Sequence, residues 1–261
     1  MTIAKINEIN INYKVEGQGE PLVMIMGLGS DKRNWMFQVP TFKKHYQLVT
    51  FDNRGVGKSS KPAAPYTTRI MADDTVGLMD YLGIKKAHIL GVSMGGMIAQ
   101  EIAINYPERV MKLILCCTYA CDDFGLSGET PEWTRAAELR EKGQTGPVIP
   151  LMFNRSLYKF IFLLLKIMRG EDMSASALAG FKGQRAACRT HQTLDRLSLI
   201  KSPTLVIVGT GDRLLKPTSS EVLAEKIPGT KLVKLKGGSH TFFVEMKNNF
   251  NKEVLNFLLR P

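Results

Sequence analysis

The feature that most constrains the fold is the run GVSMGG at residues 91–96, between an apolar stretch and a helix-like stretch at residues 97–106. Gly-x-Ser-x-Gly between a strand and a helix is the pattern of a nucleophile elbow. In so tight a turn, side chains at the positions two residues before and after the serine would clash. This explains why glycine occupies positions 91 and 95. The pattern predicts a strained backbone at Ser93, whose hydroxyl lies at the carboxyl edge of a sheet. The Met94 N–H and the helix start then point to the same space, where negative charge is stabilised.

The chain also contains the two partners that a nucleophilic serine requires. A serine hydroxyl needs a base with a pKa near neutrality, which favours histidine, and a carboxylate to fix the tautomer of that base. Asp212 and His240 each follow a predicted parallel strand, as Ser93 does, so we expect the three side chains to meet at one sheet edge. Asp122 or Asp123 is the alternative acid, whereas the other three histidines do not follow a strand. This chemistry requires no metal ion and no organic cofactor.

Hydrophobic periodicity predicts an α/β protein with one helical insertion. Residues 3–16 alternate apolar and polar residues, as in an antiparallel edge strand, and residues 68–82 have the pattern of an amphipathic helix. From residue 122 to 198 strand patterns stop and helical ones replace them. The run at 157–168, apolar nearly all round, predicts a helix buried between the core and the other inserted helices, and a membrane-surface role is the alternative. Mainly apolar runs predict strands at 22–26, 46–51, 87–90, 110–116, 204–209 and 231–235, and helical patterns predict helices at 132–142, 148–169, 174–190 and 243–259.

Composition narrows the possible partners. The chain has 261 residues, 44% hydrophobic and 23% charged, which is ordinary for a globular protein of one domain plus an insertion. Its net charge of +11 invites a nucleic-acid or acidic-membrane interpretation. The cationic residues are scattered along the chain without a nucleic-acid-binding motif, so we expect no nucleic-acid partner. The charge is instead expected to aid solubility or to attract anionic ligands.

Cysteine usage and apolar run length indicate a reduced, cytoplasmic protein. The four cysteines, Cys116, Cys117, Cys121 and Cys188, lack metal-ligand spacing and are expected to be small buried thiols. The first twelve residues alternate and include charges, unlike a signal peptide. The longest fully apolar run, residues 160–165, is too short to span a bilayer, so no stable membrane insertion is expected.

These motifs resemble the α/β-hydrolase fold family along nearly the whole chain. The resemblance implies a mostly parallel eight-stranded sheet flanked by helices, formed by residues 1–121 and 199–261, with a helical cap at 122–198 inserted after strand 6. Gly27-Leu28-Gly29-Ser30 follows a buried strand where the family has a His-Gly-x loop, which assigns the second oxyanion N–H to Leu28. The family's usual histidine is Met26 here. The loop at 52–59, DNRGVGKS, resembles a structural loop after the family's fourth strand.

The resemblance also implies an activity. With Ser93 as nucleophile, the chain is similar to carboxylesterases and to 3-oxoadipate enol-lactonases, which predicts hydrolysis of a small to medium-sized ester or lactone. Haloperoxidases or perhydrolases with the same triad, carbon–carbon bond hydrolases and slow ligand-sensing homologues remain alternatives, and the oligomeric state is open. The residues expected to line the substrate pocket are Gly27, Leu28, Met152, Phe153 and Leu157.

Overall fold

A mixed sheet organises the chain in the computed structural model, which describes residues 2–121, 129–144, 148–169 and 174–260. The described residues form an eight-stranded sheet in the order β1-β2-β4-β3-β5-β6-β7-β8. Pairs β1–β2 and β2–β4 are antiparallel and the remaining pairs are parallel, so the predicted α/β fold is confirmed. The strands are β1 (Thr2–Ile6), β2 (Ile9–Glu16), β3 (Pro21–Ile25), β4 (Gln47–Phe51), β5 (Ala87–Val92), β6 (Val110–Cys116), β7 (Thr204–Gly209) and β8 (Lys231–Leu235).

The central strands are apolar throughout because helices cover both faces of the sheet. Successive residues of β3 enter different hydrophobic clusters: Val23 and Ile25 pack with α2 and α3, whereas Leu22 and Met24 pack with α10. The helices outside the insertion are η1 (Lys32–Phe37), α1 (Val39–Phe42), α2 (Thr68–Tyr81), α3 (Met94–Asn105), η2 (Pro107–Arg109), η3 (Leu194–Leu199), α8 (Pro217–Lys226), α9 (Phe242–Glu245) and α10 (Lys247–Leu258).

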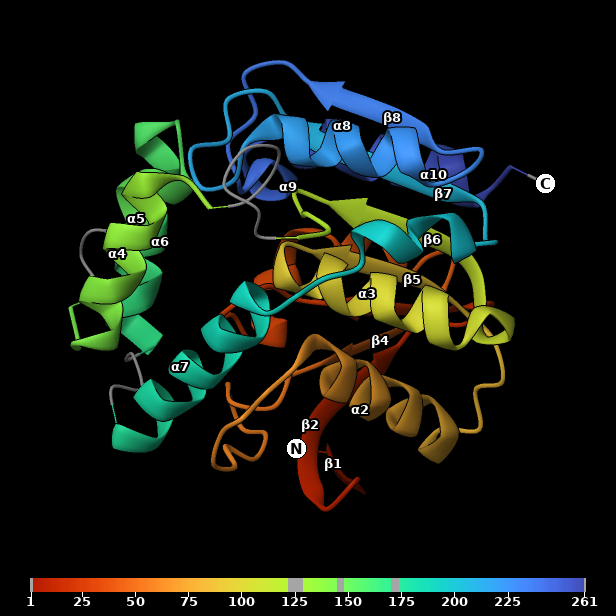
Figure 1. Cartoon of the computed structure of the whole chain (residues 1–261), viewed down its shortest axis with the longest axis horizontal. Helices are drawn as coiled ribbons and strands as arrows, with labels where there is room; N and C mark the ends of the chain where they lie inside the picture. Colours follow the sequence, from red (N-terminus) through yellow and green to blue (C-terminus); the bar gives the residue numbers. More distant parts are fainter. Residues whose placement is uncertain (1, 122–128, 145–147, 170–173, 261) are drawn as a thin grey trace.

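Between β6 and η3 the described residues form four α-helices: α4 (Pro131–Glu141), α5 (Ile149–Met152), α6 (Ser156–Arg169) and α7 (Ala175–Arg189). We call them the inserted helices. Figure 1 shows the arrowheads of β6 and β8 pointing towards the side of the molecule where these helices lie. The carboxyl ends of the parallel strands therefore face the insertion. The division into a core and a cap at residues 122–198 stays a prediction.

Three expectations about helices were wrong. The helix expected at 148–169 is divided at Phe153, whose backbone is extended, and the one expected at 243–259 is divided at Met246. The helix expected to be buried between the core and the other inserted helices is α6, yet Leu157 and Phe160 are 65% and 59% exposed. Only one face of α6 packs inwards, where the Phe162 ring lies 4.5 Å from the ring of Phe153, because no further helix covers its opposite face in the described part of the chain. No described helix is both long enough and apolar enough to cross a bilayer.

Candidate active site

The turn between β5 and α3 holds Ser93 with φ +56° and ψ −122°, a conformation that side-chain-bearing residues rarely adopt. The Ser93 N–H donates to the Cys116 carbonyl at 2.8 Å, and the Ser93 carbonyl accepts from the Gly96 N–H at 2.8 Å. A Cβ at Gly91 would lie 2.2 Å from the Gly95 carbonyl oxygen, and one at Gly95 would lie 2.1 Å from that of Ile25. Backbone atoms thus occupy the space of both missing side chains. The turn exists only with glycine at the two positions.

Asp212 and His240 form a buried, hydrogen-bonded pair beyond the ends of β7 and β8. The imidazole Nδ1 lies 2.7 Å from Oδ2 of Asp212. The other carboxylate oxygen, Oδ1, accepts the backbone N–H groups of Leu214 at 2.8 Å and Leu215 at 3.1 Å. Three donors to one carboxyl group fix its position. The Asp212 oxygen that faces Nδ1 selects the tautomer that carries hydrogen on Nδ1, which leaves Nε2 as a proton acceptor.

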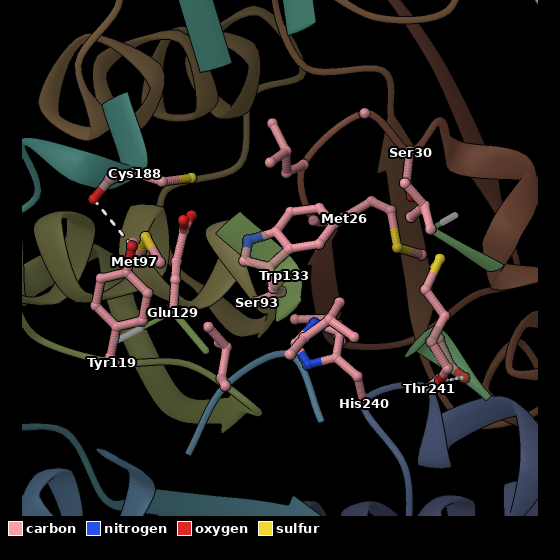
Figure 2. A pocket seen from close by; sticks show the side chains of 18 of the residues that line it. Met26, Ser30, Ser93, Met97, Tyr119, Glu129, Trp133, Cys188, His240 and Thr241 are labelled. Carbon is pink, nitrogen blue, oxygen red and sulfur yellow. Dashed lines mark hydrogen bonds between the residues drawn. The ribbon is translucent and has the colours of Figure 1, made fainter. Parts of the chain in front are cut away.

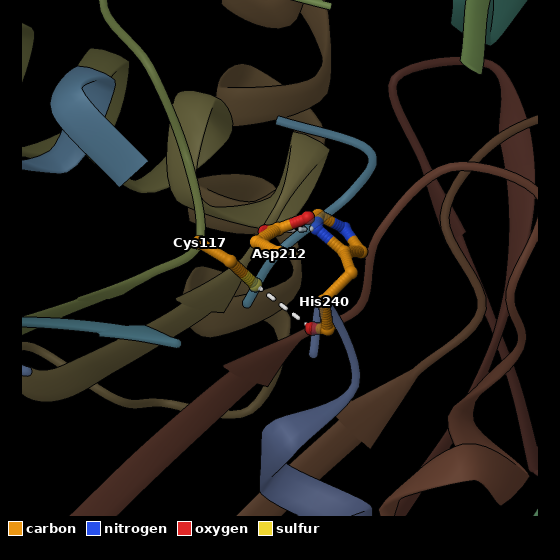
Figure 3. A group of neighbouring side chains, drawn as sticks. All are labelled: Cys117, Asp212 and His240. Carbon is orange, nitrogen blue, oxygen red and sulfur yellow. Dashed lines mark hydrogen bonds and ion pairs between the residues drawn. The ribbon is translucent and has the colours of Figure 1, made fainter. Parts of the chain in front are cut away.

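Cys117 lies beside this pair, and its sulfur points to the backbone of His240 (Figure 3). It follows β6 with φ +39°, and its Sγ–H donates to the His240 carbonyl at 3.3 Å. Ligand atoms of Cys117, Asp212 and His240 lie within 4.8 Å of one another, as a metal site would require. A metal needs the thiolate, however, and burial raises the pKa of the Cys117 thiol well above its usual range, with the Asp212 charge adding to the effect. The arrangement therefore fits a thiol that holds the histidine loop better than a metal ligand.

Ser93 and His240 line one pocket of about 100 Å³ at the carboxyl edge of the sheet (Figure 2). No hydrogen bond joins the Ser93 hydroxyl to His240, both of which lie in the described part of the chain. Such bonds are often long before substrate arrives. A Cβ at Gly27 would lie 3.0 Å from that of Ser93, so the 27–30 loop passes directly beside the hydroxyl, and Leu28 also lines the pocket. The other lining residues include Met26, Val92, Met97, Tyr119, Glu129, Trp133, Arg140, Val148, Met152, Phe181, Leu214 and Thr241.

A family model described as alpha/beta hydrolase fold matches residues 20–146. The 3-oxoadipate enol-lactonase 2 of Acinetobacter baylyi is 30% identical over 253 residues, covering 95% of this chain and 92% of its own. The chain belongs to the α/β-hydrolase family. A putative carbamate hydrolase of Azorhizobium caulinodans is 27% identical, with 98% of each chain covered. The crystal structure of the enol-lactonase from Burkholderia xenovorans LB400 superposes with a TM-score of 0.88 at 28% identity, covering 99% of this chain and 100% of that one. These relatives support a hydrolase.

Of the five residues expected to line the substrate pocket of this α/β-hydrolase, three line the pocket of Ser93 and two do not. Gly27, Leu28 and Met152 line the pocket together with Ser93 and His240. Phe153 does not line this pocket: it is buried in the cluster on the α10 side of the sheet and lines the larger cavity that adjoins the pocket at Met152. Leu157 does not either, because it lies on the solvent-exposed face of α6. The cause is the end of α5 at Met152, after which the extended backbone of Phe153 turns the chain away from the pocket.

Two other histidines, His88 and His191, do not line the pocket of Ser93. Asp122 and Asp123 lie outside the described residues. His191 is buried, its Nδ1 lies 2.9 Å from the Thr68 hydroxyl, and burial together with the nearby Arg196 charge lowers its pKa to about 3. Burial also lowers the pKa of His88, although Glu20 opposes the shift. Both histidines are therefore neutral structural groups in this α/β-hydrolase.

Sequence reasoning missed Gln184, a fully buried residue of α7. Its Oε1 accepts the Gly29 N–H at 2.8 Å, and its Nε2 donates to the Arg54 carbonyl at 2.7 Å. One side chain of the inserted helices thus fixes the loop that carries Leu28 and joins it to the loop after β4. A single glutamine within a predicted helix gives no sequence signal for such a contact.

The segment between α5 and α6 is hydrogen-bonded to the loops that carry Asp212 and His240. Asn154 Nδ2 donates to the carbonyl of Gly211 at 3.1 Å, one residue before Asp212, and to that of Gly237 at 3.3 Å, three residues before His240. The Thr241 hydroxyl donates to the Met152 carbonyl at 2.6 Å. The position of the histidine loop therefore depends on the insertion as well as on the sheet.

Proposed function

We propose that this α/β-hydrolase cleaves a carboxylic ester or lactone through an acyl-enzyme on Ser93. The observation that supports this most is the shared pocket: a serine on a strained turn and an imidazole oriented by a carboxylate both line it. Ester hydrolysis needs a nucleophile, a base and donors for an oxyanion in one small space. Ser93, His240 and the backbone beside them supply each of these groups.

In the proposed reaction, Ser93 Oγ attacks the substrate carbonyl and its proton passes to His240 Nε2. The carbonyl oxygen becomes an oxyanion that the N–H groups of Met94 and Leu28 bind, with the N-terminus of α3 adding its dipole. The intermediate then collapses, and the imidazolium donates its proton to the departing alcohol oxygen. Water, deprotonated by His240, releases the acid from Ser93. Asp212 stays ionised and stabilises the imidazolium in both halves of the reaction.

The pocket's size limits the acyl group. An apolar cavity of about 150 Å³ accommodates benzene. By that measure the 100 Å³ pocket accepts an acyl group of about four carbons. Its walls are mainly apolar, with Met97, Val148 and Leu214 among them, so a short hydrocarbon acyl group fits better than a polar one.

The test is an activity panel combined with nucleophile mapping. Esters of p-nitrophenol with two to twelve acyl carbons should show highest kcat/KM near four carbons. Ser93→Ala should lower the rate at least about 10⁴-fold, whereas Ser176→Ala, an exposed serine of α7, should leave it unchanged. A fluorophosphonate should label Ser93 alone, as read by mass spectrometry. An active Ser93→Ala variant, or label on another residue, would refute the proposal.

Further substrates in the panel separate the alternatives. A lactone and a carbamate test the reactions named for the two relatives, and a 1,3-diketone tests carbon–carbon bond hydrolysis. Peracid formation from acetate and peroxide would indicate a perhydrolase. Turnover below about 10⁻² s⁻¹ on every substrate, far under the usual enzyme range, would indicate a ligand-sensing homologue.

A further inference from the structure

Helix α6 turns an apolar face to the solvent. Leu157, Phe160, Leu163 and Leu164 are 65%, 59%, 46% and 40% exposed, and spacings of three, four and seven residues place them on one side of the helix. We call these four residues the outer face of α6. Among the described residues ten large apolar side chains are exposed, and these four fall within eight consecutive positions. Single exposed leucines are ordinary on a protein surface, whereas a contiguous apolar patch marks an interaction site.

A rotation of α6 cannot bury the outer face, because the inner face of the helix is already in use. The ring of Phe162 packs 4.5 Å from that of Phe153. Phe162 and Leu165 also line the larger cavity that adjoins the pocket of Ser93, a groove of about 850 Å³. A rotation that buried Phe160 would expose Phe162 in exchange. The outer face therefore stays open to a partner from outside the chain.

Cationic residues accompany the outer face. Helix α6 contains Lys159, Lys166 and Arg169 and no acidic residue. The half-buried Lys159 lies one turn before Leu163, so its aliphatic stem borders the outer face, and its ammonium has no hydrogen-bond or ion-pair partner among the described residues. Lys58, an exposed residue that lines the same groove as α6, also has an ammonium without a partner in the described part of the chain. Such a combination suits a partner that is apolar inside and anionic at its surface.

We propose that the outer face of α6 lies in the surface layer of an anionic lipid bilayer, with the helix axis parallel to the membrane. An amphipathic helix with cations beside its apolar face binds anionic lipid in this way without crossing the bilayer. The chain's net charge of +11 favours this partner over a second copy, because two copies repel each other whereas an anionic membrane surface attracts each of them. The proposal goes beyond the function proposed for Ser93 and does not depend on it.

The experiment is cosedimentation of the full chain with lipid vesicles of two compositions. One set contains phosphatidylcholine alone, and the other contains equal parts of phosphatidylcholine and phosphatidylglycerol. At about 0.1 M NaCl, binding to the anionic vesicles should be at least about tenfold stronger, since each cation near such a surface contributes. The preference should shrink at about 0.5 M NaCl, where the Debye length is only a few ångströms.

Paired variants test the outer face itself. Leu157→Ser combined with Phe160→Ser should weaken binding to the anionic vesicles roughly tenfold, because two half-exposed apolar side chains no longer enter the lipid. The matched control combines Leu259→Ser with Tyr81→Ser, a leucine and an aromatic residue that are 60% and 56% exposed at the ends of α10 and α2. The control should bind as the wild-type protein does. Circular dichroism checks that both double variants are folded.

Charge reversal tests the cationic edge. Lys159→Glu changes the charge beside the outer face by two and should lower binding to the anionic vesicles at least about tenfold. Lys226→Glu makes the same change at the exposed end of α8 and should lower it less than about threefold.

Three results would overturn the proposal. The first is a wild-type protein that does not bind anionic vesicles, and the second is an equal effect of the α6 variants and their controls. The third is a wild-type dimer in light scattering that only the Leu157→Ser and Phe160→Ser combination makes monomeric, because the outer face would then join two copies of the chain.

Discussion

Replacing Gln184 by methionine should slow turnover much more than it weakens substrate binding. The two side chains are similar in length, but methionine neither accepts the Gly29 N–H nor donates to the Arg54 carbonyl. The loop that carries Leu28, whose N–H we propose as an oxyanion donor, would then lose the side chain that joins it to α7. Because an oxyanion donor acts on the transition state and not on the bound ester, the effect should appear in kcat.

The expected magnitude follows from the two lost hydrogen bonds. Each contributes about 1 kcal/mol, and a buried group left without a partner costs about 1–3 kcal/mol. Gln184 is fully buried but Gly29 is only half-buried, so water replaces part of the loss. The free energy of unfolding should therefore fall by about 2–3 kcal/mol. Complete loss of one oxyanion donor costs about 10²–10³ in turnover, so a loop that still adopts the right position part of the time should lower kcat about 10- to 100-fold.

The assay is steady-state hydrolysis of p-nitrophenyl butyrate, well below the unfolding temperature of the variant. KM should stay within about threefold of the wild-type value. Lys182→Met is the matched control, because it makes the same replacement at an exposed position of α7 two residues away. Circular dichroism checks that both variants are folded. If folded Gln184→Met had a kcat within twofold of the control, Gln184 would have no role in positioning the 27–29 loop.

Three further predictions concern the turn at Gly95, the carboxyl group of Asp212 and the buried imidazole of His191. Gly95→Ala places a Cβ 2.1 Å from the Ile25 carbonyl oxygen and should destabilise the fold by more than about 3 kcal/mol in denaturant unfolding. Gly83→Ala meets no atom within 4 Å and should cost only the roughly 1 kcal/mol of a strained φ of +68°; equal costs would contradict the steric argument. Asp212→Asn should lower kcat about 10⁴-fold by favouring the wrong tautomer of the histidine, and a loss below tenfold would remove Asp212 from the mechanism. His191 has a folded pKa lowered to about 3, so its stabilising effect is present above pH 6.5 and is lost as the pH falls and the unfolded state takes up a proton. Between pH 7 and pH 5 the wild-type protein should lose about 2 kcal/mol more than His191→Gln in urea unfolding, and parallel curves would refute a neutral buried imidazole.

Much of the fold and of the candidate site could be predicted from local patterns, because their causes are local. A tight strand–helix turn excludes side chains beside its serine, so GVSMGG indicates the turn wherever the rest of the chain lies. Continuous apolar runs mark strands buried on both faces, and the carboxyl ends of parallel strands share one edge. Asp212 and His240 follow such strands, and the structure joins them by a 2.7 Å contact across 28 residues.

Only the tertiary structure decided which side chains of the inserted helices are exposed to solvent and which contact the loops of the site. The apolar residues of α6 are concentrated on one face, but a sequence pattern does not say whether such a face meets the protein or the solvent, so the exposure of Leu157 did not follow from its own sequence. The contact of Gln184 with Gly29 spans 155 residues, and no periodicity encodes a pairing at that distance. Likewise, lysines and arginines scattered along the chain gather in one groove only when β2 and the loops after β3 and β4 come together. Local sterics and hydrophobic periodicity determine the helices, strands and turns. The lining of a pocket and the electric field in it depend instead on how segments far apart in the chain pack together.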